Sequence, residues 1–139
     1  MRINLGCGPD PPEGWVNVDA AIGARLARVP LFPQLNRVMH ITHADWPRGI
    51  VIHDLRRPLP WPDESAESVY ASHVLEHVSR EQGRRMLAEC HRVLRDGGVL
   101  RVVVPDLRIL VDEYLNGVTD ARDFLHNLGT CDTDESDTF

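Results

Sequence analysis

The sequence predicts an α/β fold, a doubly wound and mostly parallel sheet of about five strands. Short apolar runs recur along the chain, and most of them end on a glycine or an acidic residue. Segments with helical periodicity or long connections separate these runs, as in parallel strands joined by crossovers. The polar residues at the strand ends would then meet at one edge of the sheet, where ligands bind in such folds.

Hydrophobic patterning locates the strands. The run at residues 99–104 is almost wholly apolar, which predicts a strand that is buried on both faces. Prolines break the segments 30–49 and 57–63, which we expect to be loops. The expected strands are residues 3–5, 15–19, 50–54, 68–71 and 99–104.

Helical periodicity is clearest at residues 80–95, where apolar side chains recur on one face. Ser79 and Gln82 match the capping box that starts a helix. The pair Gly97-Gly98 is expected to end this helix. Further helices are expected at residues 21–29, 107–115 and 121–128.

Composition indicates one globular domain at residues 1–130, followed by an acidic tail at 131–139 that we expect to be disordered. The net charge of −6 argues against a nucleic-acid partner. No apolar run reaches the roughly 18 residues of a membrane span, and the first residues do not resemble a signal peptide. Cys7, Cys90 and Cys131 form neither a disulfide framework nor a metal motif. We therefore expect a cytoplasmic protein with no membrane partner.

Residues His73 to His77 read H-V-L-E-H, a full match to the H-x-x-E-H pattern of one class of zinc peptidases. Zinc would need both histidines on one helix face together with a third protein ligand. The stretch directly follows a short expected strand, so we expect a turn that runs into a short helix, and no metal site. The remaining histidines considered, His40, His43 and His53, match no common ligand spacing and are expected to be surface or hydrogen-bonded residues.

Five motifs at the expected strand ends read L-G-C-G, G-W-V-N-V-D, D-L-R-R-P-L-P-W-P-D, S-H-V-L-E-H and V-V-P-D. Each is weak alone, but their order and spacing over about residues 3–115 are specific. Together with R-V-L-R-D-G-G before the fifth expected strand, they resemble the class I S-adenosylmethionine-dependent methyltransferases. The likeness is closest to the small bacterial type-11 group.

The resemblance implies S-adenosylmethionine as cofactor and assigns its contacts to the strand ends. Asp19 would accept hydrogen bonds from the ribose hydroxyls, and Asp54 would accept one from the adenine amino group. His73 is the first candidate for a catalytic base, with Asp106 and His77 as the other candidates. The expected cofactor-binding residues are Gly6, Cys7, Gly8, Asp19, Asp54, Leu55, Ser72 and His73.

The sequence departs from the family pattern at several points. The family usually has an acid where this chain has Asn4, and a third glycine where it has Asp10. Only eleven positions separate Gly8 from Asp19, too few for a crossover helix and a strand, so we expect a tight loop. The family fold has two further strands after the fifth, but we expect the residues after Leu115 to be too few to form both, so that these strands are missing or truncated here. We therefore expect an exposed sheet edge that a second copy or a partner chain would cover.

The function that the resemblance implies is methyl transfer to an O, N or C atom of a small metabolite or sugar-type acceptor. A truncated, non-catalytic subunit that binds the cofactor weakly or not at all is the main alternative. A nicotinamide-binding Rossmann domain is a second, because Gly6-x-Gly8 begins its fingerprint, although Pro11 and the short interval to Asp19 do not fit. A zinc peptidase is the third.

Overall fold

The computed structural model describes residues 1–39 and 45–128. His40, His43 and the expected acidic tail lie outside these described residues. Contacts divide the chain into two compact units, Met1–Val102 and Val103–Phe139. The expected single domain over residues 1–130 stays a prediction.

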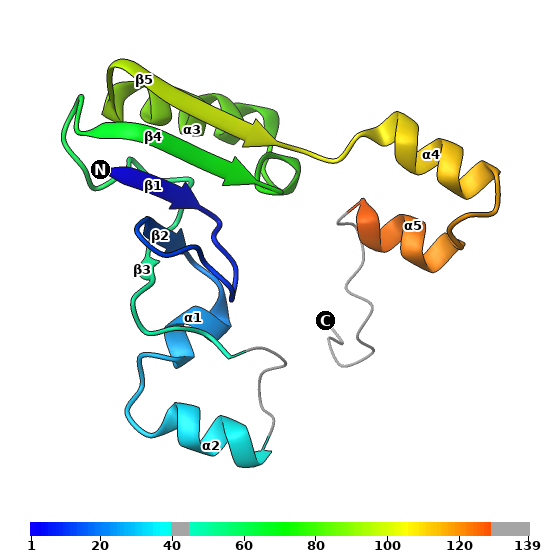
Figure 1. Cartoon of the computed structure of the whole chain (residues 1–139), viewed down its shortest axis with the longest axis horizontal. Coiled ribbons are helices and arrows are strands. Elements are labelled where there is room, and N and C mark those ends of the chain that lie inside the picture. Colours follow the sequence, from blue (N-terminus) through cyan, green and yellow to red (C-terminus); the bar gives the residue numbers. More distant parts are fainter. Residues whose placement is uncertain (40–44, 129–139) are drawn as a thin grey trace. The chain divides into compact units, whose positions relative to one another are not determined.

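Five strands form one sheet in the order β3-β2-β1-β4-β5 (Figure 1). β1 pairs in parallel with β2 and β4, so that Asn4 lies opposite Asn17 on one side and Tyr70 on the other. β2 also pairs with β3 in parallel. The doubly wound parallel sheet predicted from the sequence is therefore confirmed. The strands are β1 (Arg2–Leu5), β2 (Val16–Asp19), β3 (Val51–Ile52), β4 (Ala66–Ser72) and β5 (Leu94–Val103).

A helix-free loop, residues 6–15, joins the parallel strands β1 and β2. The amide of Asn4, only 4% exposed, donates a 3.0 Å hydrogen bond to the side-chain oxygen of Asn17. Asn17 in turn donates to the carbonyl oxygens of Pro12 at 3.0 Å and Trp15 at 3.3 Å. Two asparagines on neighbouring strands thus hold this loop, which replaces the usual crossover helix.

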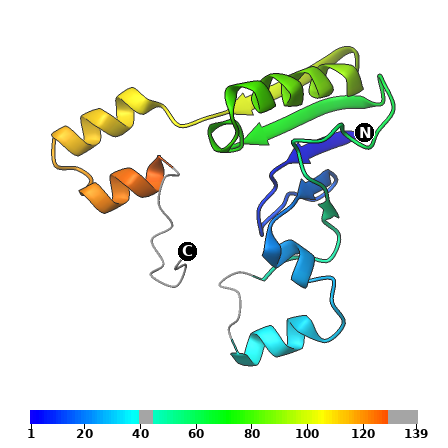
Figure 2. The same cartoon turned by 180° about the vertical axis from the view of Figure 1, so that it is seen from behind.

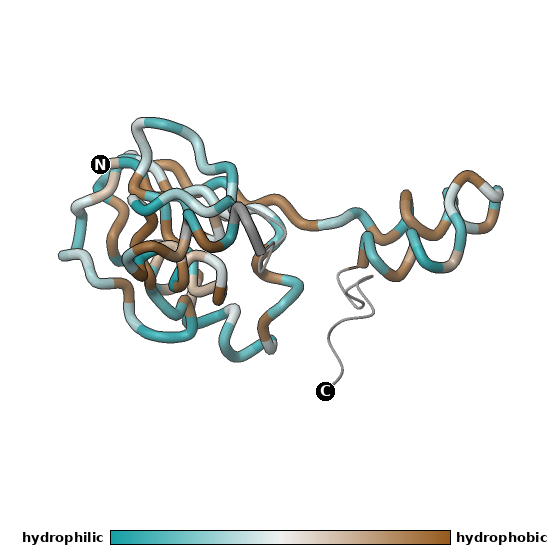
Figure 3. The backbone as a smooth tube through the Cα atoms, turned by 90° about the horizontal axis from the view of Figure 1, so that it is seen from below, coloured by the Kyte–Doolittle hydropathy of each residue, from teal (hydrophilic) through white to brown (hydrophobic). Residues whose placement is uncertain are grey.

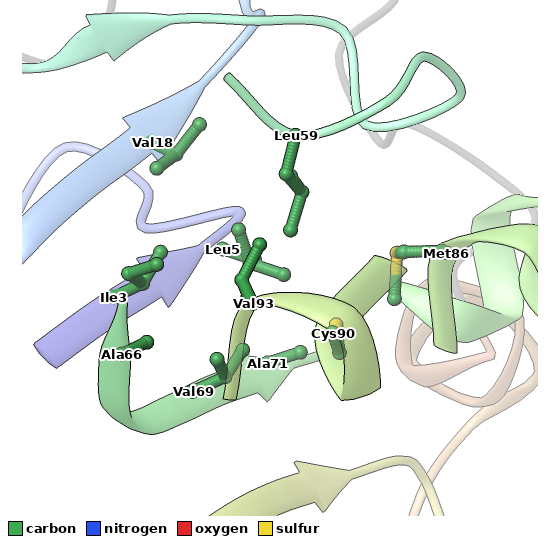
Figure 4. Close-up of a cluster of buried hydrophobic side chains, with 10 residues drawn as sticks. All are labelled: Ile3, Leu5, Val18, Leu59, Ala66, Val69, Ala71, Met86, Cys90 and Val93. Carbon is green, nitrogen blue, oxygen red and sulfur yellow. The ribbon is translucent and has the colours of Figure 1, made fainter. Parts of the chain in front are cut away.

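The helix α3 (Arg80–Val93) lies along β4 and β5 (Figures 1 and 2). Its capping box is confirmed: the Ser79 hydroxyl accepts from the Gln82 N–H at 3.3 Å, and the Gln82 side chain accepts from the Ser79 N–H at 2.9 Å. Apolar side chains of this helix join strand residues in one buried cluster (Figure 4). The cluster consists of Ile3, Leu5, Val18, Leu59, Ala66, Val69, Ala71, Met86, Cys90 and Val93.

The expected end of α3 at Gly97-Gly98 is wrong. The helix ends at Val93, and Leu94 already has an extended backbone with φ −74° and ψ 130°. Val93 is fully buried in the core cluster, and Leu94 packs against the same cluster. The two glycines lie inside β5 instead, where Gly97 adopts a left-handed φ of 73°.

β5 is not buried on both faces as expected. Successive strand side chains point to opposite faces. Leu100 packs against the cluster beneath α3, whereas Val99 is 59% exposed on the opposite face. On that face the Arg101 guanidinium lies 5.7 Å from the centre of the Tyr70 ring. In the described part of the first unit, α3 therefore covers only one face of β5. The apolar sequence of this strand predicted more burial than the structure shows.

The segment 30–49 was expected to be loop, but it contains the helix α2 (Phe32–Met39). Pro33 is the second residue of this helix, in the first turn, where a missing N–H breaks no intrahelical hydrogen bond. The preceding helix α1 (Ile22–Leu26) is shorter than the expected 21–29. Trp46 packs so closely on Gly23 in α1 that a Cβ there would collide with the indole ring.

Side chains of α3 hold the proline-rich connection 57–63, which is a loop as expected. Arg92 donates to the carbonyl oxygens of Leu59 at 3.0 Å and Trp61 at 2.9 Å, and to the carboxylate of Asp63 at 2.7 Å. Glu89 accepts from the Leu59 N–H at 2.8 Å and from Arg92 at 2.7 Å. These contacts lower the pKa of Glu89, chiefly through the hydrogen bond from Arg92.

The second unit contains the helices α4 (Leu107–Leu115) and α5 (Ala121–Asn127). Tyr114 and Phe124 stack between them, with ring centroids 5.0 Å apart. Apolar and polar residues alternate along both helices (Figure 3). None of the described helices has the length and apolar character needed to cross a membrane.

Candidate functional site

A cavity of about 510 Å³ lies at the carboxyl ends of the first four strands. Such a volume is within the range of about 300–1,000 Å³ that holds cofactor-sized ligands. Most of the expected cofactor residues line it, which confirms that the polar strand ends converge. Its lining comprises Gly6, Gly8, Asp19, Ala20, Arg25, Asp54, Leu55, Arg56, His73, Val74, His77 and Val78.

Gly6 and Gly8 both have left-handed backbones, with φ 62° and φ 67°, which L side chains rarely adopt. Their surroundings differ. A Cβ on Gly6 would collide with the side chain of Val74, so this glycine lets the segment after β4 approach β1. A Cβ on Gly8 would meet nothing within 4 Å and would project into open space. Only Gly8 therefore fits the expected role of leaving room for a ligand.

Asp19 joins the end of β2 to the glycine turn. Its Oδ2 accepts a 3.0 Å hydrogen bond from the Gly8 N–H, and its Oδ1 accepts a 2.8 Å hydrogen bond from the Ala21 N–H. Each carboxylate oxygen keeps a second lone pair for another donor. The carboxylate is therefore held in position and still has acceptor capacity for hydroxyl groups of a ligand.

Cys7 lies inside this turn but does not line the cavity. Its N–H donates to the Val18 carbonyl at 3.1 Å, and its thiol lies 3.4 Å from the Gly8 carbonyl oxygen. Burial, aided by the negative charge of Asp19, raises the pKa of the Cys7 thiol to about 11. The thiol is therefore protonated at neutral pH and is a poor nucleophile.

Asp54 is engaged by a residue that the sequence reasoning did not assign. Arg56 donates from Nε and Nη2 to the two oxygens of Asp54, each at 2.8 Å, and its backbone N–H donates at 3.0 Å. These hydrogen bonds hold the pKa of Asp54 well below its usual range. Leu55 lies between them and lines the cavity. The D-L-R spacing could have indicated this ion pair, because a short turn brings the side chains of Asp54 and Arg56 together.

The H-V-L-E-H stretch does not form the helix that a zinc peptidase needs. Its last three residues form a single 3₁₀ turn, η1 (Leu75–His77). His73 precedes it with a left-handed φ of 54°, and its Nδ1 lies 3.1 Å from a carboxylate oxygen of Glu76. His73 and His77 both line the cavity. Within residues 1–39 and 45–128, no three histidine, cysteine or acidic residues are grouped so as to hold a metal ion.

Three further residues named in the sequence analysis are absent from the cavity lining. Ser72 is the last residue of β4 and is absent from the cavity lining. Asp106, in the second unit, caps α4 by accepting from the N–H groups of Arg108 at 2.9 Å and Ile109 at 3.4 Å. His53 fits the expected surface or hydrogen-bonded residue only in part: its backbone N–H donates to the Asp19 carbonyl at 3.2 Å, but its side-chain Nε2 is buried without a hydrogen-bond partner among the described residues.

Two cationic residues of the lining, Arg25 and Arg56, were also missed. Arg25 is in the last turn of α1, a helix that was expected only in outline. It follows the lining residue Ala20 by five positions, and a single arginine in a short helix forms no motif that would have identified it.

Comparison with known proteins agrees with this geometry. The family described as methyltransferase domain matches residues 3–102. A probable S-adenosylmethionine-dependent methyltransferase of Mycolicibacterium smegmatis is 38% identical over 105 residues, which are 75% of this chain. The chain spans 37% of that relative's length. The strand order, the glycine turn and these matches together show that the chain belongs to the class I S-adenosylmethionine-dependent methyltransferases.

Proposed function

We propose that the chain binds S-adenosylmethionine in the cavity at the strand ends and serves methyl transfer to a small metabolite or sugar-type acceptor. The observation that carries this proposal is the pairing of Gly8 with Asp19. Gly8 leaves open space where a side chain would otherwise project. The carboxylate of Asp19 is held beside it by a 3.0 Å hydrogen bond from the Gly8 N–H. Family membership favours this cofactor over a nicotinamide dinucleotide or zinc.

The chain's own residues would hold the cofactor by hydrogen bonds and shape. Asp19 would accept hydrogen bonds from the ribose hydroxyls through its remaining lone pairs. Asp54, kept ionised by Arg56, would accept one from the adenine amino group beside Leu55. Cys7 and Ser72, as cofactor contacts, and Asp106, as a catalytic group, stay predictions from the resemblance.

The bound cofactor would supply a methyl group that is already electrophilic because it is attached to a sulfonium. The main task of the protein is then to hold the acceptor in line, with the reacting atoms about 3 Å apart. A base is needed only where the acceptor atom must lose a proton. His73 lines the cavity and is the residue that we assign to this step.

Isothermal titration calorimetry of S-adenosylmethionine and S-adenosylhomocysteine into the purified, metal-free chain tests the proposal. We expect micromolar binding of at least one of them. Asp19→Asn should weaken binding by about 1–3 kcal/mol, the scale of a charge-assisted hydrogen bond. Glu13→Gln is the matched control, because Glu13 is an exposed carboxylate in the loop before β2 and does not line the cavity. A folded chain that binds neither compound would refute the proposal.

A second candidate is the non-catalytic subunit, which would bind the cofactor weakly or not at all and would serve another chain. The supporting observation is β5, which lies at one edge of the described sheet with β4 as its neighbour. A second copy or a partner chain would cover this edge. Sedimentation velocity over a range of concentrations would detect self-association. Cofactor binding without methyl transfer to any hydroxyl or amino acceptor in a metabolite panel would favour this candidate.

The absence of a nucleic-acid partner and a cytoplasmic location also stay predictions. A reducing compartment is supported by Cys7 and Cys90, both of which are free thiols.

A further inference from the structure

The backbone at His73 is in an unfavourable conformation for a residue with a side chain. Its φ of 54° falls in the left-handed region, which glycine adopts at much lower cost. Such residues cluster at functional sites, where the surrounding structure maintains them. The position at the rim of the cavity, directly after β4, indicates that the conformation serves to place this imidazole.

Glu76 lies beneath this imidazole with its side chain only 15% exposed. Both of its carboxylate oxygens are shielded from solvent, and neither receives a well-aligned hydrogen bond from the described residues. The Nδ1 of His73, 3.1 Å from Oε1, is a polar atom within reach. A buried carboxylate without a donor is unfavourable, so a proton on this nitrogen is strongly favoured.

A proton on Nδ1 determines the state of the other ring nitrogen. In a neutral imidazole one nitrogen carries the proton and the other carries a lone pair, so Nε2 becomes the acceptor. The His73 side chain is 60% exposed and lines the cavity, which leaves Nε2 available to a molecule bound there.

We propose that Glu76 is a positioning residue that holds His73 as the Nδ1–H tautomer, with Nε2 ready to accept a proton from the methyl acceptor. This inference rests on the proposed function and narrows the acceptor to one that carries a hydroxyl or amino group. During transfer, the acceptor's oxygen or nitrogen bonds to the methyl carbon. The carbon–sulfur bond breaks with its electron pair left on sulfur, and the acceptor's proton passes to Nε2.

Nuclear magnetic resonance of the ¹⁵N-labelled full chain tests the tautomer without any cofactor. Long-range ¹H–¹⁵N correlations distinguish a protonated from an unprotonated ring nitrogen, and a His73→Gln spectrum identifies the signals of His73. We expect the proton on Nδ1 in the wild type, and a shift toward the Nε2–H form in Glu76→Gln. Glu81→Gln, an exposed carboxylate on α3, is the control and should change nothing.

A proton on Nε2 in the wild-type chain would overturn the proposal, whether or not Glu76→Gln folds. An unchanged tautomer in a folded Glu76→Leu chain, which has no acceptor for Nδ1–H, would also overturn it. Glu76→Asp keeps a carboxylate and should show more of the Nδ1–H form than Glu76→Gln does. A purely structural role of Glu76 would not require this difference.

A chemical probe gives a second readout. Diethyl pyrocarbonate acylates an unprotonated imidazole nitrogen, and mass spectrometry locates the modified residue. We expect His73 to react several-fold more slowly in Glu76→Gln than in the wild type, and equal rates in the two chains would contradict the proposal. Protection of His73 by S-adenosylhomocysteine in the wild type tests the proposed function separately. Fast modification without protection would reject the cofactor site and leave the role of Glu76 intact.

Discussion

The backbone N–H of Gly8 donates a 3.0 Å hydrogen bond to the carboxylate of Asp19. This bond links the turn after β1 to the end of β2, across a loop with no helix. In a doubly wound fold a helix usually spans this connection and helps to position the turn. Here the asparagine pair on β1 and β2 and the Asp19 carboxylate hold the loop instead. The proposed cofactor site therefore depends on side chains that also maintain the local structure.

The two glycines of this turn should respond differently to substitution. Gly6→Ala should destabilise the fold by about 2–4 kcal/mol, because the new Cβ adds overpacking against Val74 to the cost of a left-handed backbone. Gly8→Ala should cost only about 1–2 kcal/mol of stability, from the backbone alone, but should weaken binding of S-adenosylhomocysteine. Urea unfolding and calorimetric titration of each variant check the two effects.

A double variant separates the two causes at Gly6. Val74→Ala removes the methyl groups that the new Cβ would strike. Gly6→Ala in the Val74→Ala background should therefore cost less than in the wild type. Equal costs in both backgrounds would show that Val74 is not the reason for glycine at this position.

The Cys7 thiol should be slow to alkylate. With its pKa raised to about 11, only about one molecule in a thousand carries the thiolate at pH 8. The rate of reaction with iodoacetamide should therefore keep rising up to about pH 11. Asp19→Asn removes a negative charge that raises this pKa, so the midpoint of the rate profile should move to lower pH. Peptide mapping by mass spectrometry follows Cys7 separately from the other cysteines.

The midpoint, rather than the absolute rate, is the informative quantity for Cys7. A loosened loop in Asp19→Asn would raise the rate at every pH without moving the midpoint. Cys90, on the inner face of α3, is fully buried and should stay unmodified while the chain is folded. A midpoint near the pKa of an ordinary thiol in the wild type would contradict the prediction.

Glu89 should make stability depend on pH. Its folded pKa is lowered by Arg92, so its contribution is fully present above the usual glutamate pKa and is lost as the pH falls through the folded value. At pH 7, Glu89→Gln should lower the free energy of unfolding by about 1 kcal/mol, allowing for solvent screening. Below about pH 4 the difference from the wild type should shrink. Urea unfolding at a series of pH values measures this difference.

Glu81→Gln is the matched comparison for Glu89, because Glu81 pairs with Arg85 on the exposed side of the same helix. It should change stability little at any pH. A Glu89→Gln deficit that persists unchanged at acidic pH would assign the effect to shape and not to charge.

Local patterns in the sequence predicted much of the fold. Ser79 and Gln82 identified the start of α3, because a capping box is a contact between residues three apart. The short interval from Gly8 to Asp19 excluded a crossover helix, because a chain segment has limited reach. Glycine or acidic residues after successive apolar runs predicted that Gly6, Gly8, Asp19 and Asp54 would meet at one edge. A parallel sheet aligns its carboxyl ends, so this convergence followed from the strand order.

By itself, the sequence determined the fold class, most of the elements and the strand ends that form the cavity, because each depends on residues close together in the chain. Only the tertiary structure decided that Val74 requires glycine at position 6, that one face of β5 is exposed, and that Glu76 is buried beneath His73. Gly6 and Val74 belong to segments far apart in sequence. Burial depends on what covers a surface, and the direction of a side chain after a left-handed turn depends on the backbone around it. Those properties arise from packing, which no local pattern encodes.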